Sequence, residues 1–234
     1  MSKVMKKSAY YETPDVFGRE ENDDSRTIGI IGRSGTGKTH FVVNELNKLA
    51  GKKRANGRPV YDAIYFMTES LDATPLSGLD DSLNVKLIRG YYPKIVQLLK
   101  MIQDKSRNAF RFLIILDDIV DEKQIRRGVF VKQITILRNS HISTCVLVQY
   151  AKMLTPSCRN SLHHIYVTKI KPEEYKYLIE STLGSHVREA LGRRGGSNTE
   201  LSYDFYDWVG SDIVHYIQRY DKLKLVQRDP LPEN

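Results

Sequence analysis

The segment Gly32-Arg33-Ser34-Gly35-Thr36-Gly37-Lys38-Thr39 has the residue types and spacing needed to hold a phosphate group. It matches the pattern G-x-x-x-x-G-K-[ST], in which glycines let backbone N–H groups converge on phosphate oxygens. A helix that begins at the end of such a loop adds a favourable partial positive charge. We therefore predict that residues 32–39 and the adjoining His40 bind a nucleotide. Lys38 would reach the β- and γ-phosphates, and Thr39 would supply a hydroxyl to Mg²⁺.

A pair of acids, Asp117-Asp118, follows the apolar run at 112–116. This order is typical of a Walker-B strand, so Asp117 is expected to bind Mg²⁺ through water and Asp118 to orient or deprotonate an attacking water. Adjacent side chains on a strand point to opposite faces, so the two acids should not share one role. A glutamate is more usual at the second position, and Asp118 is one methylene shorter.

Gln149 ends another apolar run, at 143–148. A polar side chain at the tip of a core strand can sense a γ-phosphate or the attacking water. We therefore count Gln149 among the expected catalytic residues, with an ordinary strand-end glutamine as the alternative.

The elements that must position these residues alternate along the chain. Short apolar runs predict strands at 27–31, 61–67, 84–88, 112–116, 143–148 and 164–167, and 3.6-residue periodicity predicts helices at 38–50, 92–103, 122–137 and 172–183. This alternation predicts an α/β fold with a mostly parallel sheet covered by helices on both faces. With the phosphate-binding motif and the acid pair, it resembles the fold of RecA-like P-loop NTPases. The long interval between Lys38 and Asp117 leaves room for a strand inserted between the two motif strands, and we assign 61–67 to that place.

Three regions are expected. Residues 1–25 carry more acids than bases and show no sustained period, which indicates a flexible arm. Residues 26–185 form the ATPase core. Residues 186–234 form a C-terminal extension, where segments such as 211–220 mix aromatic and β-branched residues and predict antiparallel edge strands.

The composition limits the class of protein. The 234 residues are 41% hydrophobic and carry a formal net charge of +8, which favours polyanionic partners, nucleic acid first. No apolar run is long enough to span a membrane, and the N-terminal residues lack the apolar stretch of a secretory signal. With only Cys145 and Cys158, a disulfide framework is not expected.

The chain resembles the FtsK–HerA superfamily of DNA-pumping ATPases, and within it the genome-packaging ATPases of poxviruses, other large DNA viruses and virophages. The two general motifs are GRSGTGKT at 32–39 and ILDD at 115–118. The selective ones are LRNSHIS…LVQ at 137–149 and LTPSCRNS at 154–161. In the second, Pro156, Arg159 and Asn160 resemble a Pro-x-x-Arg-x-Asn stretch, although here the asparagine directly follows the arginine. KIKPEEYKYL at 169–178 resembles the family's return helix, whereas Tyr150-Ala151-Lys152 departs mildly from the pattern.

This resemblance implies an ATP- and Mg²⁺-dependent motor that translocates double-stranded DNA into a preformed capsid. It also implies a homo-oligomeric ring, pentameric or hexameric, that docks on capsid components in the host-cell cytoplasm, with the virion as a further location. Such rings use an arginine from a neighbouring subunit, and Arg138 lies where that residue is expected, with Arg159 as the second candidate. DNA contacts are expected from two basic clusters, the first being Lys123, Arg126, Arg127 and Lys132, and the second Arg188, Arg193 and Arg194.

Other interpretations stay open at this point. A P-loop kinase would pass phosphate to a small acceptor, and Gln149 would then have no clear role. A non-hydrolytic module would use ATP only to set an assembly state, and a helicase-like or initiator-type ATPase is a further alternative.

Overall fold

The computed structural model describes residues 16–18, 25–72, 74–118, 137, 139–162, 164–167, 177, 214–219 and 222–227, the last two ranges for their backbone only. The strands are β1 (Thr27–Ile31), β2 (Ala63–Thr68), β3 (Val85–Arg89), β4 (Phe112–Asp117), β5 (Ile142–Val148), β6 (His164–Val167), β7 (Val214–Arg219) and β8 (Lys222–Gln227). The helices are α1 (Lys38–Asn47), α2 (Pro93–Ser106) and α5 (Pro156–Asn160), with short 3₁₀ turns η1 (Thr74–Gly78) and η2 (Ala151–Met153).

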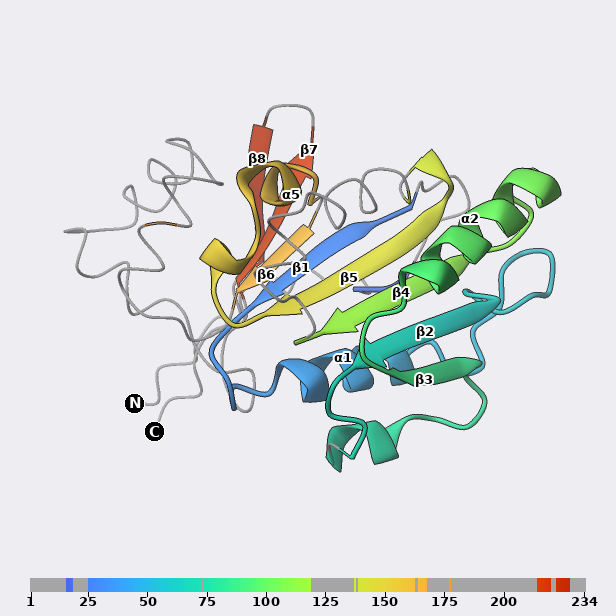
Figure 1. Cartoon of the computed structure of the whole chain (residues 1–234), viewed down its shortest axis with the longest axis horizontal. Helices are drawn as coiled ribbons and strands as arrows, with labels where there is room; N and C mark the ends of the chain where they lie inside the picture. Colours follow the sequence, from blue (N-terminus) through green and yellow to red (C-terminus); the bar gives the residue numbers. More distant parts are fainter. Residues whose placement is uncertain are drawn as a thin grey trace, which may run out of the picture.

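The described strands form one sheet in the order β3-β2-β4-β5-β1-β6-β7-β8. The first six are parallel, whereas β7 and β8 are added antiparallel beyond β6. Figure 1 shows the parallel strands side by side, with their carboxyl ends on the side where α1 begins. The predicted α/β fold, with a mostly parallel sheet and an antiparallel addition, is confirmed.

The sheet has an apolar core on each face because most residues of its central strands are apolar and buried. On one face α1 packs Phe41, Val42 and Leu46 against residues such as Phe66 and Leu113. On the other face α2 packs Val96 and Leu99 against residues that include Ile114 and Val146. Alternate residues of each strand thus point to opposite cores, as a doubly covered parallel sheet requires. None of the helices in the described ranges is long and apolar enough to cross a bilayer.

One expectation about strand order is wrong. A strand does lie between the two motif strands β1 and β4, but it is β5, not the strand near 61–67. That segment forms β2, which pairs with β4 on the side away from β1. The apolar runs give each strand's position in the sequence, but strand order depends on which crossovers pack, which is a non-local property.

The N-terminal segment also differs from the expected arm. Val16 is 2% exposed and Phe17 is fully buried, and both pack in the core that contains α1. Arg26 reaches back to this segment, donating a hydrogen bond to the carbonyl oxygen of Val16 at 3.5 Å. Two isolated apolar residues show no periodicity, so the sequence could not mark them as core. The predicted helix 122–137 lies outside the described residues apart from Leu137, and the helix 172–183 apart from Tyr177.

Gly29 of β1 is needed for a close approach. A Cβ atom built there would lie 2.5 Å from Cδ1 of Leu162, which is 1% exposed and has little room to move. The absence of a side chain at this position therefore lets the crossover before β6 pack on β1.

We predict that Gly29→Ala destabilises the protein by about 1–3 kcal/mol, the usual cost of overpacking a tight core. Urea unfolding of both proteins measures the difference. Gly78→Ala is the matched control, because its Cβ would meet only Cγ1 of Val43 at an ordinary 3.9 Å. Adding Leu162→Ala should reduce the effect of Gly29→Ala in a double-mutant cycle. A Gly29→Ala protein as stable as wild type would contradict the close approach.

Candidate nucleotide-binding site

The loop between β1 and α1 has the backbone shape expected of a phosphate-binding loop. Gly35 and Gly37 adopt left-handed conformations, with φ of 77° and 82°, which a residue with a side chain adopts only under strain. Inside the loop the Thr36 hydroxyl donates to the carbonyl oxygen of Arg33 at 2.8 Å. Gly37 precedes the first residue of α1, so no side chain caps the first turn of the helix. The backbone N–H groups of the first turn of α1 and the helix dipole are thus available to an anion.

Lys38 is held under this loop. Its ammonium donates hydrogen bonds to the carbonyl oxygens of Gly32 at 2.9 Å and Arg33 at 3.2 Å, and the residue is 5% exposed. Burial lowers the pKa of Lys38, while the carboxylates of Asp118 and Asp117 act in the opposite direction. The loop carbonyls therefore hold the ammonium against the loop, within the electrostatic influence of the acid pair.

Asp117 closes the site from the end of β4. Its Oδ2 accepts a hydrogen bond from the Thr39 hydroxyl at 2.8 Å, which joins the first turn of α1 to the second motif strand. Burial raises the pKa of Asp117 to about 6, against the lowering effect of the Thr39 hydrogen bond. A hydroxyl and a carboxylate in contact form the oxygen donor set that Mg²⁺ prefers. Thr39 and Asp117 are thus together, as the sequence predicts for a metal site.

Asp118 departs from the strand geometry. Its φ is 51°, so the chain leaves the sheet at this residue and the strict alternation of faces ends with Asp117. Asp118 is exposed, yet its negative charge has the largest raising effect on the pKa of Lys38, against the lowering by burial. The second acid therefore lies at the solvent side of the site, near the lysine, where a water molecule can reach it.

Gln149 follows β5, which lies between β1 and β4. The N–H of Gly32 donates to the carbonyl oxygen of Val148 at 3.0 Å, so the end of β5 is fixed to the start of the phosphate loop. Gln149 is partly exposed and emerges between the loop and Asp117. Strand order thus brings the third sequence-predicted group to the same edge as the other two.

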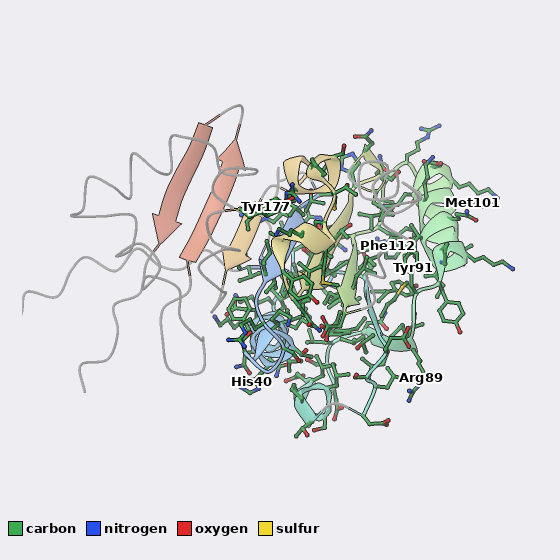
Figure 2. The ribbon with its side chains drawn as sticks, turned by 60° about the vertical axis from the view of Figure 1, so that its left-hand side comes forward. His40, Arg89, Tyr91, Met101, Phe112 and Tyr177 are labelled. Carbon is green, nitrogen blue, oxygen red and sulfur yellow. The ribbon has the colours of Figure 1, made fainter. Side chains whose placement is uncertain are left out.

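The remaining predicted residues divide into three groups. Arg33, Ser34 and His40 are exposed at the loop and the start of α1, and Figure 2 shows His40 there. Arg159 is 2% exposed and donates to carbonyl oxygens of its own chain, a placement that does not fit an arginine reaching into a neighbouring subunit. The other predicted residues lie outside the described part of the chain, namely Arg138, Lys123, Arg126, Arg127, Arg193 and Arg194.

One neighbour of the site was missed from the sequence. Thr68, at the end of β2, pairs in register with Asp117 and is 2% exposed. Its hydroxyl accepts a hydrogen bond from the N–H of Ser70 at 3.1 Å, which turns the chain at the strand end. Only the pairing of β2 with β4 places Thr68 beside the acid, and no local pattern in the sequence indicates that pairing.

We predict that Asp117→Asn stabilises the nucleotide-free protein at pH 8. Because burial raises the folded-state pKa to about 6, the folded chain binds the proton more tightly than the unfolded chain, and stability falls as pH rises from about 4 to above 6. Asparagine removes the cost of burying the charge, which is about 1–3 kcal/mol at 1.36 kcal/mol per pKa unit. Its amide oxygen can still accept the hydrogen bond from the Thr39 hydroxyl.

Denaturant unfolding between pH 4 and pH 8 measures this effect, and the advantage of Asp117→Asn should vanish near pH 4. Asp118→Asn, at the exposed neighbouring position, is the matched control and should gain less. An advantage that does not change with pH would contradict the burial of a charged Asp117.

Known proteins resemble this chain in sequence and in fold. Residues 17–186 match the model of the family described as Poxvirus A32 protein. No curated protein sequence matches the chain significantly.

Among solved structures, this chain is similar to the genome packaging NTPase B204 of Sulfolobus turreted icosahedral virus 2 in complex with ATP-gammaS. The TM-score is 0.54 and the sequence identity is 13%, and the match covers 90% of this chain and 100% of B204. The AMP complex of that protein gives a TM-score of 0.57 at 12% identity, over 90% and 100%. The DNA-packaging ATPase B204 of Sulfolobus turreted icosahedral virus gives 0.56 at 12% identity, over 88% and 98%. At these identities the likeness concerns the fold. The family match covers most of the chain and confirms the resemblance drawn from its motifs: this protein belongs to the Poxvirus A32 protein family.

Proposed function

We propose that this chain is an ATP-driven motor subunit that moves double-stranded DNA into a preformed capsid. The single observation that carries the proposal is the contact between Thr39 and Asp117 beneath a phosphate loop that holds Lys38. This is the arrangement of a P-loop NTPase, and it occurs here in a chain of the A32 family. The structurally similar B204 proteins are described as genome-packaging NTPases and were solved with ATP-gammaS and AMPPCP.

The described residues have separate roles in the proposed hydrolysis. The loop amides and Lys38 bind the phosphates and stabilise charge that develops on them. Thr39 and Asp117 fit Mg²⁺, which when bound neutralises charge on the β- and γ-phosphates. Asp118, exposed at the end of β4, accepts a proton from the attacking water, and Gln149 orients that water from the end of β5. Asp118 and Gln149 directly follow the neighbouring strands β4 and β5, which supports a shared role at one water molecule.

The motor is completed by assembly. We propose a homo-oligomeric ring, pentameric or hexameric, in which Arg138 of one subunit approaches the nucleotide of the next. The ring docks on capsid components at the viral assembly site in the host-cell cytoplasm. The net charge of +8 on each chain supports contact with the phosphates of DNA. Lys123, Arg126 and Arg127 are the first candidates for this contact, and Arg193 and Arg194 are the second.

The proposal is tested first by ATP turnover with Mg²⁺, measured with and without double-stranded DNA. Lys38→Ala should reduce turnover by about 10²–10³-fold or more, because it removes a donor that stabilises transition-state charge. Lys94→Ala, an exposed lysine of α2, is the matched control and should leave turnover unchanged. Turnover undiminished in Lys38→Ala would refute the site. Hydrolysis that DNA does not stimulate would favour a kinase or an assembly module instead.

We predict that Arg138→Ala lowers turnover by about 10³–10⁵-fold, the usual contribution of an arginine supplied in trans. Wild-type turnover per subunit should rise with protein concentration, since sites form only between subunits. In mixtures with Lys38→Ala subunits, turnover should recover in part, because each Lys38→Ala subunit supplies an intact Arg138 to the intact site of an Arg138→Ala neighbour. A monomer with full activity at every concentration would exclude this arrangement.

DNA binding should be electrostatic and blind to sequence. Log K then falls with log[salt] at a slope of about −0.9 per neutralised phosphate, so replacing Arg126 and Arg127 with alanine should flatten the slope by about two units. Basal turnover should be retained, because neither residue is assigned to the nucleotide. If the slope does not change, the same measurement with Arg193→Ala and Arg194→Ala decides whether the second cluster is the DNA contact. If neither pair changes it, the basic charge is not a DNA footprint.

A further inference from the structure

Arg159 is a charged residue in the interior of the protein. It lies in α5, in the crossover from β5 to β6, and is 2% exposed. Its Nη1 donates hydrogen bonds to two carbonyl oxygens, that of Ala151 at 3.1 Å and that of Leu154. These two carbonyls stand at the start of η2 and directly after its end. One guanidinium therefore holds both ends of the turn.

Among the described residues, none neutralises the charge of Arg159. In the described part of the chain no carboxylate pairs with it, and its Nε is buried without an acceptor. The ring of Tyr177 lies over the guanidinium, with 5.0 Å between Cζ and the ring centroid, and Lys152 lies 5.1 Å from the same ring. Figure 2 shows Tyr177 against the gold segment that carries η2 and α5. Burial of a charge without a counter-ion is costly, and an apolar side chain of similar volume is often the more stable choice. The contacts within the described part of the chain thus do not by themselves favour an arginine over an apolar side chain.

The turn that Arg159 holds follows the nucleotide site directly. Gln149 precedes Ala151 by two residues, and Val148 accepts a hydrogen bond from Gly32 of the phosphate loop at 3.0 Å. Residues 148–154 are thus fixed at one end by the phosphate loop and at the other by Arg159. The position of Gln149 depends on both attachments, because only Tyr150 separates it from the turn.

We propose that Arg159 is a positioning residue that acts within its own subunit. By holding η2 it sets the place of Gln149 beside the nucleotide, and the ring of Tyr177 keeps the guanidinium in that position. Arg159 is therefore not the arginine supplied to a neighbouring subunit. This inference rests on the proposed ATPase function, and it assigns a role to the arginine of the segment LTPSCRNS at 154–161.

Steady-state kinetics of the full chain give the first test. Arg159→Met should lower kcat by about 10²-fold, as small misplacements of catalytic groups do, with the KM for ATP changed less than about twofold because the phosphate loop is untouched. Arg159→Lys keeps the cation but loses the planar guanidinium, so its kcat should lie between that of Arg159→Met and that of wild type. Tyr177→Leu should lower kcat in the same way, whereas Tyr177→Phe, which keeps the ring, should not. A proportional rise in KM, or an unchanged kcat, would overturn the proposal.

Mixed assemblies give the second test, which separates action in cis from action in trans. A mixture of Arg159→Met and Lys38→Ala subunits contains no subunit with both residues intact, so turnover should stay at the level of the separate variants. If Arg159 acted in trans, a Lys38→Ala subunit would supply it to the intact Lys38 of its neighbour, and turnover would recover. Recovery in this mixture would overturn the proposal. The mixture of Arg138→Ala with Lys38→Ala is the matched control, in which recovery is expected.

Hydrogen exchange supplies a readout that needs no hydrolysis. AMPPCP should protect the amides of residues 149–155 in wild type but not in Arg159→Met, if the arginine connects this turn to the nucleotide site. Equal protection in both proteins would overturn the proposal. Wild type that fails to hydrolyse ATP would refute the proposed function, and this comparison would still decide the role of Arg159.

Discussion

The hydrogen bond between Thr39 and Asp117 is the constraint on which the site depends. It joins residues 78 positions apart in sequence, one on α1 and one at the end of β4. A donor–acceptor distance of 2.8 Å is possible only if β1, β5 and β4 hold a fixed register, which the pairs Ile31 with Val148 and Leu147 with Asp117 provide. A shift of one residue in β4 would turn Asp117 to the other face of the sheet, and a shift in β1 or β5 would change the register that brings Thr39 to it. The apolar interior of the sheet is therefore also what holds the polar edge together.

The same arrangement places two opposite charges where water has little access. Lys38 and Asp117 are each about 5% exposed, and burial shifts the pKa of each toward its neutral form. Each group also counters the shift of the other, so the pair is more tolerable than either charge alone. A site of this kind favours polyvalent ligands that bring their own counter-ions, as a nucleotide with Mg²⁺ does.

Local features of the structure could be predicted from the sequence, whereas non-local ones could not. The phosphate loop, the acid pair and the strand ending before Gln149 are each encoded within a few residues, and the structure brings all three to one edge. The place of β5 between β1 and β4 is set by crossovers, and the apolar run at 61–67 carried no sign that it would pack on the far side of β4. Arg159 shows the same limit. Its motif suggested an exposed arginine, but its burial under Tyr177 depends on a residue from a different part of the chain. Val16 and Phe17 are buried through contacts with distant residues, which no periodicity could indicate.

The carbonyl oxygens that hold Lys38 have a consequence for ligand choice. The ammonium is already engaged by Gly32 and Arg33, so the loop keeps its shape without a phosphate and little conformational entropy is lost on binding. To bind Lys38, an anion must instead form hydrogen bonds with the ammonium that are stronger than those of the two neutral carbonyl oxygens. Hydrogen bonds between charged partners are about twice as strong as neutral ones, so a polyphosphate meets this condition with several oxygens at once. A weakly charged or singly coordinating anion gains too little to displace the carbonyls. The loop carbonyls thus compete with the ligand for Lys38, so that only ligands with a high density of negative charge bind the lysine.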